Sequence, residues 1–221
     1  MNKLFVRAAF VLLFAVVSTA TFAQPFADEI AAFKKQDSLA FPPKHAILFV
    51  GSSSFRKWQD VSAYFPNYTI INRGFGGSTL PDMIRYEQDI IFPYQPKQIV
   101  IYCGENDVAS SDTVTAQIVF ERFKKLYSDI RMVMPDVPLL FVSLKPSPSR
   151  WQMRDRMIAA NKLIKKYLKK KNNAAFVSVW NDMLGADGKP MPDIFVGDNL
   201  HMNAKGYAIW QKLIEPYLLK N

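Results

Sequence analysis

The chain contains five short apolar runs, which are separated by longer segments of mixed character. Val, Ile and Phe dominate these runs, and polar residues do not alternate with apolar ones inside them. Uninterrupted runs of this length are typical of strands that are buried on both faces of a parallel sheet. The five predicted strands are Ala46 to Val50, Tyr68 to Asn72, Gln98 to Tyr102, Pro138 to Ser143 and Ala175 to Val179.

The segments between the runs are predicted to be mostly helical. Between Thr113 and Met134, apolar residues recur every three or four positions, which is the period of an amphipathic helix. We expect Asp112 or Thr113 to cap the start of this helix. Two further helices are predicted over residues 150–171 and 203–219. The alternation of strands and helices predicts an α/β fold in one domain, with a five-stranded parallel sheet in a three-layer α/β/α sandwich.

The first 23 residues are predicted to be a secretory signal peptide. Lys3 and Arg7 precede an apolar run over residues 8–17, and small residues lead to Ala23. This arrangement predicts cleavage after Ala23, so that residues 24–221 form a periplasmic or secreted domain. An uncleaved anchor is the alternative, although the run is short for a bilayer span of roughly 20 residues. No cysteine stands at the cleavage point, so we expect neither a lipid anchor nor any other stable membrane anchor.

Composition and charge limit the function classes. The 221 residues are 49% hydrophobic, and 28 Lys and Arg stand against 19 Asp and Glu, for a net charge of +9. Such a chain can bury a core, which excludes a disordered protein. Six lysines lie in residues 162–171, and their spacing predicts one solvated helix face, with contact to an anionic envelope surface as the alternative. We expect no nucleic-acid partner, because the chain is predicted to be exported and carries no recognised binding motif. Cys103 is the only cysteine, so an internal disulfide is excluded.

Small polar residues follow three of the predicted strands. The segments are Gly51 to Ser54, Asn72 to Thr79 and Gly104 to Asp107. The carboxyl ends of parallel strands meet at one edge of a sheet, where ligands bind. A fourth polar segment, Asp198 to His201, precedes the last predicted helix. We therefore expect the chemistry of this protein at that edge.

These segments supply the parts of a serine acyl-transfer site. Such a site needs a nucleophile, a base, a group that orients the base and donors for an oxyanion. The serine turn offers the nucleophile, His201 a base and Asp198 a carboxylate three residues away. The other histidine, His45, precedes the first strand and belongs to the opposite edge. The backbone N–H of Gly77 and the side-chain amide of Asn106 are candidate oxyanion donors.

The order of the segments resembles a known family. Gly51-Ser52-Ser53, Gly77, Gly104-Glu105-Asn106-Asp107 and Asp198-x-x-His201 resemble the four conserved blocks of the SGNH (GDSL) hydrolases. The resemblance covers nearly the whole chain after the predicted signal, and it implies a flavodoxin-like fold and a serine esterase without metal or cofactor. It also implies that Ser53 is the nucleophile, and that Ser53, Gly77 and Asn106 are the oxyanion donors. Asp198 and His201 would complete the triad.

The first block departs from the usual Gly-Asp-Ser-Leu of that family. Ser52 stands in place of the Asp and Ser54 in place of the Leu. Ser53 holds the aligned position, and Ser52 and Ser54 are the alternatives for the nucleophile. The same departure is the only support for a reading of another class, a carbohydrate-binding module that has lost catalysis.

Other reaction types have less support in the sequence. It contains no Gly-x-Ser-x-Gly elbow of an α/β-hydrolase, no cluster of zinc ligands and no Gly-x-Gly-x-x-Gly after the first strand. Cys103 is a rival nucleophile at the end of the third strand, and we expect it to be a small core residue instead.

The loop after the fourth predicted strand is expected to contact substrate. Arg150 and Trp151 are the candidates, because a Trp ring offers a flat apolar face to a sugar or an acyl chain. The alternative is that Trp151 only anchors the following helix. Predicted export favours a small-molecule or glycan ester, above all O-acetyl esters of envelope or extracellular glycans. Lysophospholipids and other short lipid esters are the alternative substrates.

Overall fold

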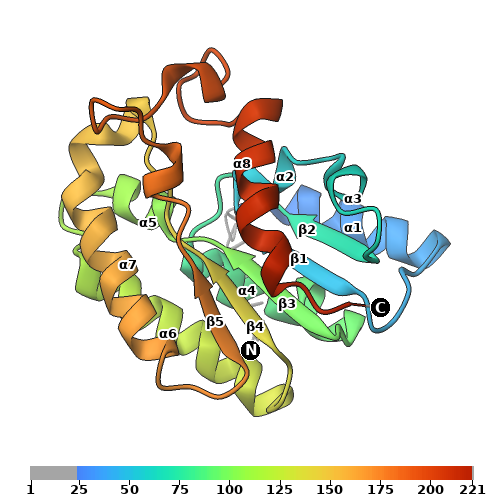
Figure 1. The fold of residues 1–221 in the computed structure, drawn as a ribbon. Coiled ribbons are helices and arrows are strands. Elements are labelled where there is room, and N and C mark those ends of the chain that lie inside the picture. The colour runs from blue at the N-terminus through green and yellow to red at the C-terminus, as the bar shows by residue number, and fades with distance from the viewer. Residues whose placement is uncertain (1–23, 221) are drawn as a thin grey trace, which may run out of the picture.

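The computed structural model describes residues 24–220, and the predicted signal peptide lies outside that range (Figure 1). Five strands form one parallel sheet in the order β2-β1-β3-β4-β5. This is the strand order of flavodoxin-like doubly wound folds, and it confirms the predicted fold class. The strands are β1 (Ile47–Gly51), β2 (Ile70–Gly74), β3 (Gln98–Tyr102), β4 (Leu139–Val142) and β5 (Ala174–Val177). All five overlap the predicted runs, and β2 begins two residues later than expected.

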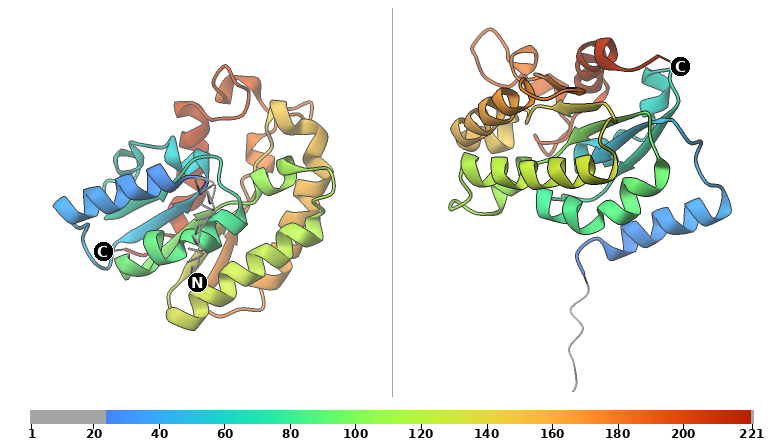
Figure 2. Two further views of the ribbon diagram at one scale, coloured as in Figure 1. Left: turned by 180° about the vertical axis from the view of Figure 1, so that it is seen from behind. Right: turned by 90° about the horizontal axis from the view of Figure 1, so that it is seen from below.

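Helices cover both faces of the sheet and create three layers, as the two views of Figure 2 show. One face carries α1 (Ala27–Leu39), α4 (Leu80–Ile90), α5 (Glu105–Ser110), α6 (Ala116–Val133) and α7 (Arg154–Leu168). The other face carries α2 (Ser53–Arg56), α3 (Val61–Tyr64) and α8 (Ala204–Ile214). Short 3-10 helices are η1 (Phe92–Tyr94), η2 (Pro148–Met153), η3 (Asn181–Met183), η4 (Pro192–Ile194) and η5 (Glu215–Tyr217).

The central strand β1 shows why the apolar runs do not alternate with polar residues. Leu48 and Val50 pack into the core under α4 and α6, whereas Ile47 and Phe49 pack into the core under α2 and α8. All four side chains are fully buried. A strand between two helical layers has no solvent face, so both sets of alternate positions must be apolar.

The predicted helices exist, but some of their ends differ. α6 begins at Ala116, because the Thr115 side chain accepts the Ile118 N–H at 3.3 Å; the expected cap at Asp112 or Thr113 is wrong. The helix predicted from residue 150 begins at Arg154, since η2 occupies the preceding residues. The last helix ends at Ile214 and continues only as the 3-10 turn η5.

The strand order changes direction between β1 and β3, and doubly wound sheets have their crevice at the carboxyl ends of the strands at such a point. From β1 the chain moves to β2 on one side, whereas β3, β4 and β5 follow on the other side. The loops after β1 and β3 therefore diverge, which is where open α/β sheets bind ligands. No helix within residues 24–220 has the length and apolar character needed to cross a bilayer.

Candidate active site

The serine turn at the end of β1 owes its shape to close contact with β3. Gly51 has a φ of +147°, and a Cβ there would lie 2.0 Å from the carbonyl oxygen of Tyr102. Any other residue would be strained and would displace β3. The Ser52 N–H donates to the same carbonyl at 2.9 Å, and the chain then turns directly into α2. Ser53 thus becomes the first residue of a helix at the crevice.

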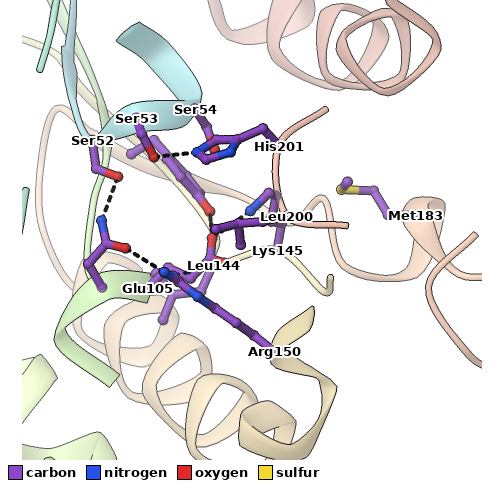
Figure 3. Close-up of polar contacts among 12 residues, drawn as sticks. Ser52, Ser53, Ser54, Glu105, Leu144, Lys145, Arg150, Met183, Leu200 and His201 are labelled. Atoms are coloured by element: carbon purple, nitrogen blue, oxygen red, sulfur yellow. Dashed lines mark hydrogen bonds and ion pairs between the residues drawn. The ribbon is translucent and has the colours of Figure 1, made fainter. Parts of the chain in front are cut away.

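Ser53, His201 and Asp198 form a hydrogen-bonded chain across this edge of the sheet. The Ser53 Oγ lies 2.9 Å from His201 Nε2, and Figure 3 shows the two groups facing each other. On the other side of the ring, His201 Nδ1 lies 2.6 Å from Asp198 Oδ2. Ser53 is the serine of the turn that contacts the imidazole, because the Ser52 hydroxyl bonds to Asn106 and Ser54 is buried. The geometry favours Ser53 over the two alternative serines.

The Asp198 carboxylate is held in place by its own loop. Its Oδ1 accepts the backbone N–H groups of Leu200 at 2.9 Å and His201 at 2.8 Å, while Oδ2 bonds to the ring. Partial burial raises the pKa of Asp198, but the bonds from the His201 side chain and these two N–H groups outweigh it. The pKa of the Asp198 carboxyl therefore lies well below its usual range. A permanently ionised carboxylate can fix the orientation of the imidazole.

Three candidate N–H donors lie at or beside the serine turn. A Cβ on Gly77 would be 3.7 Å from Asn106 Nδ2, so the glycine loop and the Asn106 amide are neighbours. Within the described residues, the backbone N–H groups of Ser53 and Gly77 donate no hydrogen bond to the protein. Asn106 Nδ2 donates to the Ser52 Oγ and to the Ser78 carbonyl, each at 3.1 Å. These groups can supply donors to an oxyanion that forms beside Ser53.

Arg150 holds the other end of the Asn106 amide. Its Nη2 donates to Asn106 Oδ1 at 2.8 Å, which orients the amide so that Nδ2 points to the serine turn. Its Nη1 lies 3.2 Å from Glu105 Oε1, and 17% of the side chain is exposed. Arg150, which was predicted to bind substrate, is therefore occupied by two protein partners.

A buried charged cluster lies behind this pair. Lys145 Nζ lies 2.7 Å from Glu105 Oε2, and the Tyr102 hydroxyl donates to the same oxygen. The side chains of Lys145 and Glu105 are 1% and 3% exposed. Burial raises the pKa of Glu105, yet the charges of Lys145 and Arg150 outweigh it and lower this pKa. Burial lowers the pKa of Lys145 and raises that of Tyr102. The sequence motif contained Glu105 but assigned it no role of its own, and no motif singled out Lys145.

The N-terminal helix α1 supports the glycine loop from outside. Glu29 Oε2 accepts the Gly76 N–H at 3.1 Å and pairs at 2.6 Å with Arg56 Nε, on the same helix as Ser53. Gly76 has a φ of +33°, and a Cβ there would lie 2.2 Å from the Phe26 ring. One carboxylate thus connects the loop of Gly77 with the helix of Ser53. No sequence motif pointed to this contact.

The remaining candidates lie away from the Ser53 hydroxyl. His45 lies two residues before β1, at the opposite edge. Cys103 is fully buried, and burial raises the pKa of its thiol, as suits a core residue. Trp151 stacks on Trp180, with ring centroids 6.3 Å apart, and Arg154 lies over its ring. Within residues 24–220, no group of three or more His, Cys, Asp or Glu could hold a metal ion.

Comparisons with known proteins agree with this geometry. The sequence profile of the GDSL-like lipase/acylhydrolase family matches residues 37–209, well over half of the chain. A search of curated proteins finds no match to this chain.

Solved structures share the fold at low sequence identity. A Streptococcus pneumonia protein whose description refers to platelet activating factor has a TM-score of 0.76 at 17% identity, over 87% of this chain and 92% of that one. A GDSL-like lipase from Bacteroides thetaiotaomicron has a TM-score of 0.69 at 22% identity, over 85% and 96%. A catalytic mutant of an acetylxylan esterase from Geobacillus stearothermophilus has a TM-score of 0.62 at 15% identity, over 79% and 94%.

The family match spans all four polar segments at the carboxyl edge of the sheet, from the serine turn to His201. It favours a hydrolase of ester bonds over a carbohydrate-binding module without catalysis. Fold, site geometry and sequence profile agree, and this chain belongs to the GDSL-like lipase/acylhydrolase family.

Proposed function

We propose that the protein is an exported serine esterase that uses Ser53, His201 and Asp198 as a catalytic triad. The observation that carries the proposal is the 2.9 Å contact between Ser53 Oγ and His201 Nε2, with Asp198 on the far side of the ring. A hydroxyl becomes a useful nucleophile when an oriented base can take its proton.

In this mechanism the Ser53 Oγ attacks the ester carbonyl carbon while its proton moves to His201 Nε2. The tetrahedral intermediate then collapses, and the alcohol leaves with that proton. Water, deprotonated by His201, attacks the acyl-enzyme and releases the acid. Throughout both steps, Asp198 keeps Nδ1 as the donor nitrogen and stabilises the imidazolium.

The negative charge of each intermediate would fall on the carbonyl oxygen. We assign the backbone N–H groups of Ser53 and Gly77 and the Asn106 amide as its donors, since Asn106 contacts the serine turn at Ser52 and Gly77 lies beside Asn106. Asn106 must give up its bond to the Ser52 hydroxyl to bind the oxyanion. Ser52, where the family usually has Asp, thus occupies the Asn106 donor before substrate arrives.

We propose O-acyl esters of extracellular or envelope glycans, acetyl esters first, as substrates. The predicted signal peptide supports an extracytoplasmic substrate, and the similarity in fold to an acetylxylan esterase supports a glycan ester. The predicted localisation, periplasmic or secreted, rests on the sequence of residues 1–23.

Labelling with a fluorophosphonate probe, followed by peptide mapping, tests the nucleophile. We expect the label on Ser53 and none on the Ser53→Ala variant. A panel of p-nitrophenyl esters, acetylated xylan and a lysophospholipid tests the substrate. Faster turnover of the lysophospholipid than of every acetylated glycan would replace the glycan proposal with a lipid one. Activity that EDTA abolishes and zinc or manganese restores would contradict the metal-free mechanism.

A further inference from the structure

A hollow of about 280 Å³ lies between α7 and the edge strand β5, outside the site described above. Lys162 and Lys165 line it from α7, and Phe176, Trp180 and Asn181 line it from β5 and the turn that follows. We propose that this hollow, the α7–β5 groove, binds carboxylated sugar units of an acidic polysaccharide whose ester group is cleaved at Ser53. This inference rests on the proposed function and names its substrate class.

The charge at the C-terminal end of α7 is the first support. Six exposed lysines lie in residues 162–171, three of them on α7 and three in the turn that follows, and none of them forms an ion pair with another described residue. Several lysines elsewhere do pair with carboxylates, among them Lys34 with Asp89 and Lys125 with Asp129. A dense unpaired charge of one sign raises the local concentration of an oppositely charged polymer. The partner that fits this surface is therefore a polyanion.

The aromatic rings of the groove limit the chemical class of the polyanion further. The half-buried Phe176 ring and the edge of Trp180, a core residue that is 9% exposed, line the same hollow as the two lysines, and the amide of Asn181 adds a polar group. A sugar ring offers C–H groups to an aromatic face, while a ring carboxylate offers an acceptor to a lysine ammonium. Sites for small ligands combine apolar walls with a few polar groups in this way. A uronic acid unit satisfies both parts.

The groove is connected to the candidate active site by a series of contacts. Arg150 bonds to Asn106 beside the serine turn, and Trp151 follows it in the chain. The Trp151 ring stacks on Trp180 at an interplanar angle of 24°, and Trp180 lines the groove. In Figure 1 the start of α7 and the loops before α8 lie at the same end of the molecule. One polymer chain can therefore contact both places.

A membrane surface fits the groove less well. Interfacial binding needs apolar side chains that project from the surface and enter the lipid. The aromatic rings here line a concave surface, and Phe176 and Trp180 are not among the exposed large apolar side chains of the described residues. None of those exposed side chains lies on α7.

The test compares two double variants with the same change in charge. Lys162→Gln/Lys165→Gln removes the lysines of the groove. Lys166→Gln/Lys170→Gln removes two lysines, one on α7 and one in the turn after it, that line a separate hollow with Phe120 and Tyr167. Isothermal titration calorimetry with polygalacturonate, with neutral xylan and with phosphatidylglycerol vesicles measures binding. Acetate release from acetylated polygalacturonate measures turnover.

We expect the unaltered protein to bind polygalacturonate and neither xylan nor vesicles. The groove variant should raise the Kd for polygalacturonate and the KM for its acetylated form about tenfold, and the control variant less than threefold. Both variants should hydrolyse p-nitrophenyl acetate within twofold of the unaltered protein, because this ester carries no charge for the groove to bind.

Equal losses in the two variants would overturn the groove, because they would indicate general attraction to α7. Binding to vesicles alone, or no binding of polygalacturonate by a protein that hydrolyses p-nitrophenyl acetate, would also overturn it. A protein that does not hydrolyse p-nitrophenyl acetate would contradict the esterase proposal instead. Binding of polygalacturonate is measured separately, so the two failures are distinguishable.

Discussion

Two charged networks meet at the carboxyl edge of this sheet, and they differ most in their access to water. In the network of Ser53, His201 and Asp198, 43% of the Asp198 side chain is exposed and 14% of His201. In the network of Lys145, Glu105 and Tyr102, every side chain is buried. Arg150 and Asn106 connect the second network to Ser52, the chain neighbour of Ser53.

The difference in burial matches a difference in task. A group that exchanges protons with substrate and water during each turnover must stay accessible to both. A group that fixes the direction of an oxyanion donor acts best where water cannot screen it or let it move. We therefore expect changes in the exposed network to affect turnover, and changes in the buried network to affect stability first.

Loss of the nucleophile should produce the largest effect. Ser53→Ala removes the hydroxyl that contacts His201 and should lower kcat for p-nitrophenyl acetate by about 10⁴-fold or more. Ser54→Ala is the matched control and should stay within threefold, since Ser54 is buried and its hydroxyl forms no hydrogen bond with the imidazole. Thermal unfolding of both variants should remain close to that of the unaltered protein. Near-full activity of Ser53→Ala would assign the nucleophile to another serine.

Breaking the buried pair should cost stability instead. Lys145→Met leaves the Glu105 carboxylate buried with only Arg150 as a cation, and should lower the free energy of unfolding by about 3 kcal/mol. Urea denaturation measures this change. Lys145→Met/Glu105→Gln removes both charges and should recover part of the loss. A double variant less stable than the single one would show that the charges do not act as a pair.

Asn106 stands between the networks and should affect catalysis with little effect on folding. Asn106→Ala removes one assigned oxyanion donor and should lower kcat by about 100- to 1000-fold. Ser52→Ala, which removes only the acceptor that Asn106 bonds to before substrate arrives, should change kcat by less than about tenfold. Equal losses in these two variants would place the catalytic contribution on Ser52 rather than on the amide.

A variant of Arg150 tests whether this side chain positions Asn106 or contacts substrate, as the sequence predicts. Arg150→Met removes the bond to Asn106 Oδ1 and should lower kcat about tenfold with KM unchanged, the value of roughly one hydrogen bond. A rise in KM at constant kcat would instead support the substrate role. Steady-state kinetics with p-nitrophenyl acetate and butyrate distinguish the two results.

The smallest expected effect concerns pH and compares the two carboxylates. The pKa values of Asp198 and Glu105 are both lowered on folding. Each therefore stabilises the protein above the unfolded pKa of about 4, and this stabilisation is lost as pH falls through the lower folded value. At pH 7, Asp198→Asn should lower the free energy of unfolding by less than about 1 kcal/mol, because water screens its partly exposed carboxylate.

Glu105→Gln, at a buried position, should lower the free energy of unfolding at pH 7 by more than Asp198→Asn does. The gap should narrow as pH falls below about 4, because the unfolded chain then binds protons at these carboxyl groups while the folded protein still keeps them ionised. Equilibrium denaturation at pH 7 and in this acid range measures the gap. A loss of stability for Asp198→Asn that equals or exceeds that of Glu105→Gln would contradict the contrast between the exposed and buried networks.

Structural features that depend on residues close together in the sequence were predictable from the sequence. The apolar runs identified all five strands, because a strand between two helical layers needs apolar residues at every position. The motif of Asp198 and His201 was also visible, since both residues belong to one tight loop. The cap at Thr115 and the start of α7 at Arg154 were missed, because they depend on which of several polar or Pro-rich positions the packing selects.

By itself, the sequence determined the layered α/β fold and the set of polar segments at one edge of the sheet. Only the tertiary structure decided how those segments combine. Ser53 and His201 are 148 residues apart and meet because the chain after β5 crosses back over the sheet, where Tyr207 of α8 donates to the Ser54 carbonyl at 2.8 Å. The bond of Arg150 to Asn106, the burial of Lys145 and the contact of Glu29 with Gly76 join distant elements in the same way. Periodicity reports the face that a residue occupies, whereas the partner across an interface depends on the packing of whole elements.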